Sequence, residues 1–263
     1  MKGPYASLFS LEDRVALITG AGSGLGEATA LGFAEYGANI VNLDLSSERA
    51  ENTAQTIRSM GRVSIAIQAD VSDSRQVKAA VETSFEKFRR IDVLVNSAGI
   101  GAHVPAISLS EAEWDHVIDV SLKGTFLCCQ AAGKVMLEQR KGSIVNLTSI
   151  GGIVALGRGT AAIAASKGGV NMVTRELAVE WAPYGVRVNA LAPCQFRTPA
   201  LEAVLRDPQF DADSLMRNWI TDIPIGRIGE VKDILGPALF LASDASLMVT
   251  GHILPVDGGY LAR

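Results

Sequence analysis

Cysteine and histidine are scarce in this chain of 263 residues, which contains three of each. Three cysteines are too few for a disulfide framework, and none of the histidines stands at the spacing of a zinc finger or a helical metal pair. The sequence therefore predicts no metal site, and its free thiols suit a reducing compartment.

Positive charge is not in excess, and long apolar segments are absent. Lysine and arginine number 24 against 28 aspartates and glutamates, so the formal net charge is −4 and no basic run stands out to bind nucleic acid. The first 14 residues lack the basic and apolar regions of a secretory signal, and no later run reaches the roughly 18 apolar residues of a membrane span. We expect a cytoplasmic protein with no nucleic-acid or membrane partner.

Short runs rich in valine and isoleucine recur along the chain. They are apolar nearly throughout, which is typical of strands buried on both faces of a parallel sheet. The predicted strands are Arg14–Thr19, Asn39–Leu45, Ser64–Asp70, Ile91–Asn96, Ser143–Ser149, Arg187–Pro193 and His252–Asp257.

Segments with helical periodicity lie between these runs. The predicted helices are Gly24–Tyr36, Ser47–Met60, Ser74–Arg89, Glu111–Glu138, Thr160–Ala182 and Val231–Ala242. Strands and helices alternate from end to end, so the sequence predicts an α/β fold. We expect a single Rossmann-like, doubly wound domain over residues 1–263, with a seven-stranded parallel sheet and helices on both faces.

One segment, Ala200–Asp222, interrupts this alternation. It is helical in pattern and separates the last two predicted strands. Ligands of open α/β sheets bind beyond the carboxyl ends of the strands, so an insertion there predicts a substrate lid at about residues 195–225. The alternative is a surface segment without a role.

A glycine-rich turn joins the first predicted strand directly to the first predicted helix. Glycines at this junction let the backbone approach a pyrophosphate, and the free N–H groups of the helix start favour its negative charge. The strand before the turn and the helix after it favour a dinucleotide site over a tight turn without a ligand. The residues expected to contact the cofactor here are Gly20, Ser23, Gly24, Leu25 and Gly26.

An acidic residue, Asp44, ends the second predicted strand, 18 residues after Gly26. A carboxylate at that distance can accept hydrogen bonds from the adenosine ribose, and it would repel a 2′-phosphate. Leu45, which follows the aspartate, is also expected to contact the cofactor. Neither Ser23 nor Leu45 supplies a positive charge. The sequence therefore predicts NAD(H) rather than NADP(H) as the cofactor.

From about Leu11 to Tyr260 the chain resembles the classical short-chain dehydrogenase/reductase family. The residues that match its motifs are Thr19, Gly20, Gly24 and Gly26, then Asp70-Val71, Asn96-Ser97-Ala98-Gly99, Pro193 with Thr198-Pro199, and Val256-Asp257-Gly258-Gly259. The resemblance implies hydride transfer between nicotinamide C4 and a substrate carbonyl or alcohol carbon. It also implies a homotetramer packed through the predicted helices Glu111–Glu138 and Thr160–Ala182 and the C-terminal strand.

The resemblance extends the set of expected cofactor contacts beyond the glycine turn. These further positions lie after the third, fourth and sixth predicted strands and on the helix Thr160–Ala182. They are Asp70, Val71, Asn96, Ala98, Gly99, Lys167, Pro193 and Thr198.

The family's catalytic residues are matched only in part. The resemblance implies that a serine orients the substrate oxygen, that a tyrosine four residues before a lysine moves the proton, and that an asparagine completes a water relay. Ser149 matches the serine and Lys167 the lysine. The tyrosine position holds Ile163 and the asparagine position holds Ser121, while Cys194 stands where the family has a glycine.

Isoleucine has no exchangeable proton, so a reaction at this site needs another proton path. Lys167 is one candidate, because an ammonium near an oxidised nicotinamide, without a phenol partner, can have a depressed pKa. The alternative is that Lys167 only binds the ribose. His103 and Cys194 form a second candidate pair on the substrate side, although loop histidines and small cysteines are commonly structural.

Three functions remain open for a small-molecule substrate of unknown identity. The cofactor residues with Ser149 and Lys167 favour an NAD(H)-dependent oxidoreductase with a tyrosine-free proton path. The joint absence of the proton donor and the relay residue favours a non-catalytic NAD(H)-binding protein. A third function is a non-redox activity that uses His103 or Cys194.

Overall fold

The structure is a computed structural model that describes residues 5–101, 103–208 and 211–263. Its main sheet has seven strands in the order β3-β2-β1-β4-β5-β6-β9, and every neighbouring pair is parallel. The strands are β1 Val15–Thr19, β2 Asn39–Asp44, β3 Ser64–Gln68, β4 Val93–Asn96, β5 Gly142–Leu147, β6 Val186–Pro193 and β9 Ile253–Val256. The α/β class and the seven-stranded parallel sheet are confirmed, with each predicted strand end within two residues of the observed one.

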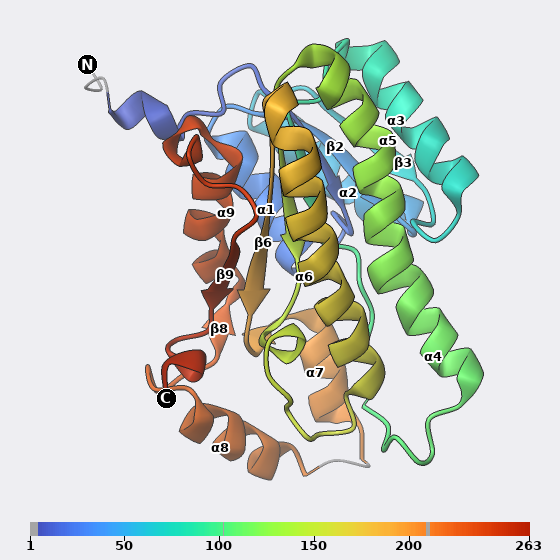
Figure 1. The fold of residues 1–263 in the computed structure, drawn as a ribbon, viewed down its shortest axis with the longest axis vertical. Helices are drawn as coiled ribbons and strands as arrows, with labels where there is room; N and C mark the ends of the chain where they lie inside the picture. The colour runs from blue at the N-terminus through green and yellow to red at the C-terminus, as the bar shows by residue number, and fades with distance from the viewer. Residues whose placement is uncertain (1–4, 102, 209–210) are drawn as a thin grey trace.

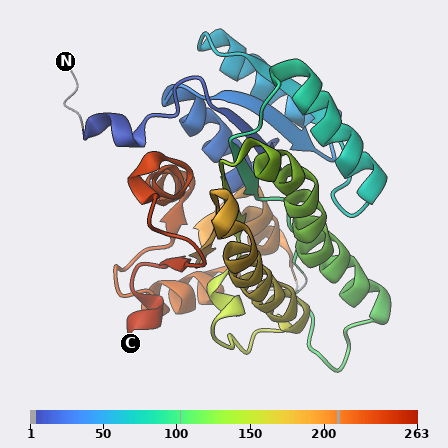
Figure 2. The same ribbon diagram turned by 45° about the horizontal axis from the view of Figure 1, so that its top comes forward.

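Helices cover both faces of this sheet (Figures 1 and 2). Helices α1 Gly24–Glu35, α2 Ser47–Ser59 and α9 Leu235–Ala242 share one hydrophobic cluster with the strands. Helices α3 Ser74–Phe88, α5 Gly124–Gln139 and α6 Ala161–Trp181 share the other. The two layers match the predicted doubly wound arrangement.

The double coverage explains why the strand sequences are apolar on successive residues. Side chains of neighbouring strand residues point to opposite faces of a sheet. In β1, Leu17 belongs to the cluster with α3, α5 and α6, whereas Ile18 belongs to the cluster with α1 and α9. Both residues are almost completely buried, so both faces of the strand are packed against apolar side chains.

The predicted helix Glu111–Glu138 is wrong in one respect, because it is not a regular α-helix throughout. Helix α4 Glu111–Ile118 is followed by a π-helical turn, Asp119–Lys123, and then by α5. A π turn accommodates an extra residue without proline or glycine, so the sequence pattern does not reveal it. The turn contains Ser121, whose position it therefore sets.

Two helices follow β6 at the place where the sequence predicts a helical insertion. They are α7 Pro199–Arg206 and α8 Ala212–Asp222. A separate two-stranded sheet, which the sequence analysis did not predict, pairs β7 Phe196–Arg197 with β8 Gly229–Glu230. Positions 209 and 210 of the predicted lid, like residues 1–4 and 102 of the predicted domain, lie outside the described residues.

Candidate active site

The glycine turn after β1 brings two backbone segments into very close contact. A Cβ atom at Gly26 would lie 2.2 Å from the carbonyl oxygen of Gly20, so no larger residue fits there without moving the turn. Gly20 itself has φ +64°, which glycine adopts at little cost. Ser23 precedes α1 and makes no side-chain capping hydrogen bond, so it leaves the first N–H groups of α1 to a ligand. These features fit the pyrophosphate of a dinucleotide.

Thr19 joins the ends of β1 and β4, which are neighbours in the sheet. Its Oγ1 accepts hydrogen bonds from the backbone N–H groups of Ser97 and Ala98, both at 3.1 Å. The chain leaves β1 toward β2 on one side and reaches β4 on the other, so this is the switch point of the sheet, where ligands of doubly wound folds bind.

Asp44 lies beside the same turn and is almost fully buried. Its Oδ2 accepts a hydrogen bond from the Gly22 N–H at 3.0 Å, and its Oδ1 accepts one from Ser46 at 2.9 Å. The guanidinium of Arg49 lies 3.2 Å from Oδ1 and is half exposed. The sequence analysis missed Arg49, although its place in the first turn of α2 indicates that it faces the end of β2.

Asn96, predicted to contact the cofactor, directs its side chain into the core instead. Its Nδ2 donates to Asn146 Oδ1 at 2.8 Å and lies 3.2 Å from Cys129 Sγ. Asn146 in turn donates to Thr174 of α6 at 2.9 Å. This buried network ties β4, β5, α5 and α6 together below the site.

Other predicted cofactor residues lie around the same edge. Asp70 uses its carboxylate to accept the N–H and the hydroxyl of Ser72. Val71 is buried against Gly124, where a Cβ atom would lie 2.7 Å from it. Thr198, at the start of α7, lies over Gly24, and its Cγ2 would be 3.5 Å from a Cβ there.

Ser149 and Lys167 reach the carboxyl edge from β5 and α6. The Ser149 hydroxyl is partly exposed and accepts a hydrogen bond from the Gly151 N–H at 3.1 Å. Lys167 Nζ donates to the carbonyl oxygen of Leu147 at 2.8 Å. Burial lowers the pKa of Lys167 to about 8, because the charged form loses solvation.

Two of the predicted catalytic residues, Lys167 and Ser121, lie close to Gly99. A Cβ atom there would lie 3.4 Å from Lys167 Nζ and 3.6 Å from Ser121 Oγ. Ser121 is fully buried, and its hydroxyl lies 3.2 Å from both the N–H and the carbonyl oxygen of Ile100. The Ser121 hydroxyl therefore both accepts and donates a hydrogen bond with Ile100 in the loop between β4 and α4.

Ile163 packs against the same loop. Its Cδ1 would lie 2.9 Å from a Cβ atom at Gly101, so an alkyl group stands where the resemblance places a phenol. Tyr36 and Tyr184 are exposed elsewhere on the molecule, and Tyr260 stacks against the guanidinium of Arg263 at 5.1 Å.

His103 and Cys194 have separate surroundings. Burial lowers the pKa of His103, a hydrogen bond with the Arg158 backbone opposes this, and the Arg158 charge adds to the lowering. Cys194 packs against an apolar cluster that contains Trp219, and burial, followed by the charge of Asp257, raises the pKa of its thiol to about 11. No hydrogen bond joins His103 to Cys194 among the residues that the structure describes.

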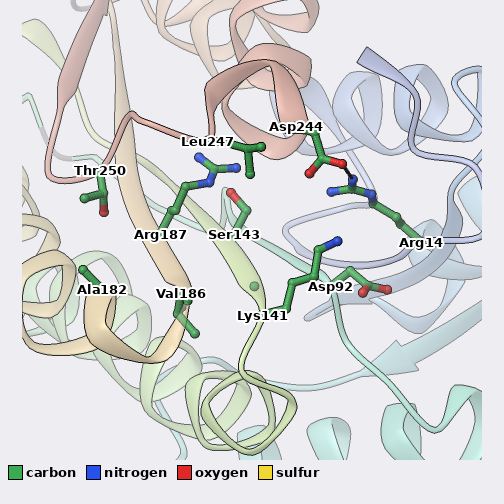
Figure 3. Close-up of a pocket in the computed structure, with 12 residues that line it drawn as sticks. Arg14, Asp92, Lys141, Ser143, Ala182, Val186, Arg187, Asp244, Leu247 and Thr250 are labelled. Carbon is green, nitrogen blue, oxygen red and sulfur yellow. Dashed lines mark ion pairs between the residues drawn. The ribbon is translucent and has the colours of Figure 1, made fainter. Parts of the chain in front are cut away.

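A cavity of about 240 Å³ lies at the opposite, amino-terminal edge of the sheet (Figure 3). Two arginines that line it are bound within the protein. Arg14 pairs with Asp244 at 2.5 Å, and Arg187 donates to the carbonyl oxygens of Leu241, Ser243 and Val249. Arg187 thereby holds the carboxyl end of α9 against β6, which is a structural role.

Two general features of the described ranges bear on function. Within them, no group of histidine, cysteine, aspartate and glutamate side chains is arranged to hold a metal ion. Their helices include none with both the length and the apolar composition needed to cross a membrane.

Comparison with known proteins gives matches over almost the whole chain. A family described as enoyl-(acyl carrier protein) reductase matches residues 20–261. The chain is 42% identical to D-threitol dehydrogenase of Mycolicibacterium smegmatis over 97% of its length and 95% of that protein. It is 39% identical to 5-keto-D-gluconate 5-reductase of Escherichia coli, over 97% of this chain and 98% of the relative.

Solved structures superpose equally well. A gluconate 5-dehydrogenase from Burkholderia cenocepacia, in complex with NADP and tartrate, has a TM-score of 0.92 at 36% identity, over 98% of this chain and 99% of that one. NAD+-bound xylitol dehydrogenase has a TM-score of 0.90 at 31% identity, over 95% and 99% of the two chains. These similar structures thus hold either nicotinamide cofactor.

The close approach at Gly26 leads to a prediction for cofactor binding. Gly26→Ala would force the turn apart, and we expect it to weaken NADH binding at least about tenfold, as overpacking at a fixed backbone does. Gly236→Ala on α9 is the matched control, because a Cβ there meets nothing within 4 Å. Titration of NADH fluorescence measures both variants, and equal affinities would contradict a dinucleotide at this turn.

Proposed function

The chain belongs to the short-chain dehydrogenase/reductase family, and from this premise we propose that it is an NAD(H)-dependent oxidoreductase that interconverts an alcohol and a carbonyl without a catalytic tyrosine. The observation that carries the proposal is the composition of the carboxyl edge. A glycine cradle at Gly20 and Gly26 lies at the same carboxyl edge of the sheet as Ser149 and Lys167, which match the serine and the lysine of the family's site.

The nicotinamide cofactor would supply or accept the hydride. In this proposal the glycine turn and the start of α1 hold its pyrophosphate, and Asp44 holds the adenosine ribose. Thr198, which lies over Gly24, closes this part of the site from the side of α7.

Ser149 is assigned the orientation of the substrate oxygen. Its hydroxyl accepts one hydrogen bond, from Gly151, and so keeps its own hydrogen for a substrate oxygen. The same contact fixes the Oγ position, which limits the orientations open to the substrate.

Lys167 is assigned the proton. During alcohol oxidation its neutral amine takes the hydroxyl proton while the hydride leaves the carbon, and during carbonyl reduction its ammonium returns a proton to the oxygen. A pKa of about 8 allows both forms near neutral pH. Ser121 is bound to Ile100, so it offers no second path through the position of the family's asparagine.

A non-catalytic NAD(H)-binding protein is the second candidate function. Two observations favour it. The side chain of Ile163 has no exchangeable proton, and the Ser121 hydroxyl is hydrogen-bonded to the backbone of Ile100. A non-redox activity has less support, because the thiol of the partly buried Cys194 has a raised pKa and His103 adjoins Arg158 rather than Cys194.

The proposed function is tested by nicotinamide absorbance with NAD+ and NADH across a panel of alcohols and carbonyls. We expect slow turnover by the wild type, and a gain of about 100-fold in the variant Ile163→Tyr/Ser121→Asn, since general acid–base catalysis contributes about 10²–10⁴-fold. Turnover only in the restored variant would contradict native catalysis and support a binding role.

The pH dependence of that turnover tests the proton path. Oxidation needs the neutral amine of Lys167, so its rate is expected to rise with pH through about 8, while the rate of reduction falls. Lys167→Arg keeps the charge but cannot release the proton, and it should lose this pH step. Lys78→Arg, exposed on α3, is the control. A flat wild-type profile would contradict the assignment.

Cofactor preference depends on Asp44 and Arg49 together, because the guanidinium partly offsets the carboxylate. We propose a preference for NAD(H), since the carboxylate is the buried partner and Arg49 is half exposed. Asp44→Ala should reduce the ratio of NAD to NADP affinity at least about tenfold, and Arg49→Ala should increase it. Binding titrations with both cofactors measure the ratios, and an unchanged ratio in Asp44→Ala would refute the role.

The proposal extends to the assembly and its surroundings. We propose that α7 and α8 act as a substrate lid in a single domain, and that the free thiols suit the cytoplasm.

A homotetramer is supported by exposed apolar side chains on α5, α6 and the segment before β9, among them Phe126, Met172, Val179 and Met248. Light scattering should give about four times the chain mass of 27.7 kDa, and the mass of a monomer would overturn this part.

A further inference from the structure

A cluster of charged side chains joins three segments that lie far apart in the sequence. Arg158 belongs to the loop between β5 and α6, Asp222 ends α8, and Arg263 is the C-terminal residue. Asp222 Oδ2 lies 2.5 Å from Arg158 Nη2, and its Oδ1 lies 2.7 Å from Arg263 Nη2. One carboxylate is therefore shared by two guanidiniums.

The Arg158 guanidinium is also incompletely hydrogen-bonded. Its Nη1 is buried, and no residue in the described ranges accepts a hydrogen bond from it. A buried donor without an acceptor costs free energy that a suitable ligand oxygen would recover. Arg187 at the opposite edge of the sheet shows the contrasting case, because its donors are bound to three backbone carbonyls.

Arg158 lies next to a loop that borders the candidate active site. Gly159, its neighbour, accepts a hydrogen bond from the Val104 N–H at 2.9 Å, so the β5–α6 loop lies along the β4–α4 loop. The β4–α4 loop also contacts Ile163 through Gly101. The ion pair with Asp222 joins the β5–α6 loop to α8. Ser149 and Arg158 both belong to the connection between β5 and α6, and the inference takes a substrate held at Ser149 to extend along this connection toward Arg158.

We propose that Arg158 recognises a carboxylate on the substrate, and hence that the substrate class is hydroxy acids and keto acids that carry their acid group away from the reacting carbon. The inference rests on the proposed function, because it names the substrate class of the same site. Nη2 stays with Asp222, and Nη1 donates to the ligand. A guanidinium suits this task, since its fixed planar donors match carboxylate oxygens and its charge is permanent.

The test compares two ligands that share a four-carbon skeleton and two secondary hydroxyl groups. Tartrate carries carboxylates at its ends, whereas threitol of the same configuration carries neutral alcohols. Calorimetric titration of each into the protein saturated with NADH measures binding without turnover, because neither ligand can be reduced by NADH. We expect the wild type to bind tartrate at least about tenfold more tightly than threitol, as a charge-assisted hydrogen bond does.

Arg158→Met is expected to remove this preference by lowering tartrate affinity at least about tenfold while leaving threitol affinity within about twofold. Arg158→Lys keeps the charge without the planar donors and should give an intermediate preference. Arg75→Met is the matched control, because Arg75 is 90% exposed on α3 and pairs with Asp73, away from the site. Unchanged NADH affinity shows that each variant is folded.

The outcomes separate this inference from the proposed function. Wild-type preference for threitol, failure of both ligands to bind, or a full tartrate preference in Arg158→Met would overturn the role of Arg158. If a variant fails to fold, the comparison of tartrate and threitol binding by the wild type still tests whether the site prefers a carboxylate. Selective tartrate binding without turnover of any substrate would overturn the proposed function and leave the carboxylate site standing.

Discussion

The contact between Gly26 and the carbonyl of Gly20 is the constraint on which the rest of the site depends. Because of this contact, α1 begins at Gly24, shortly after β1 ends at Thr19. The N–H groups at the start of α1 therefore lie at the carboxyl edge of the sheet. The same turn gives the Gly22 N–H to Asp44, while Thr19 holds the end of β4 beside it. One close backbone approach thus brings three segments that are far apart in the sequence to the same part of the carboxyl edge.

The polar side chains of the candidate active site differ in how their hydrogen-bonding groups are used. Lys167 and Ser149 each make a hydrogen bond to the backbone, and in the proposed mechanism they also act on the substrate. Ser121 instead uses its hydroxyl for hydrogen bonds with the Ile100 backbone. Ile163 replaces a proton donor by an alkyl group packed on Gly101. Burial that shifts the pKa of Lys167 toward neutrality is the physical effect that can offset this loss.

The two edges of the sheet treat buried charge in opposite ways. At the amino-terminal edge, Arg14 and Arg187 are bound to Asp244 and to backbone carbonyls, so the charges stabilise the fold. At the carboxyl edge, Arg158 has a buried donor for which residues 5–101, 103–208 and 211–263 provide no acceptor, and Asp222 is shared with a second arginine. An unsatisfied donor at the edge where ligands bind is a cost that a ligand can recover.

The sequence alone was enough to predict the alternation of strands and helices and the glycine turn, because strand and turn signals are local. It was also enough to locate Asp44 and the departures at Ile163 and Ser121, because motif residues have fixed spacings along the chain. Only the tertiary structure decided that Asn96 faces the core, that a π turn sets the position of Ser121, and that Arg49 lies against Asp44. It also brought Arg158, Asp222 and Arg263 together across more than 100 residues. Such contacts depend on which helix face and which loop meet after folding, and no local pattern in the chain encodes that meeting.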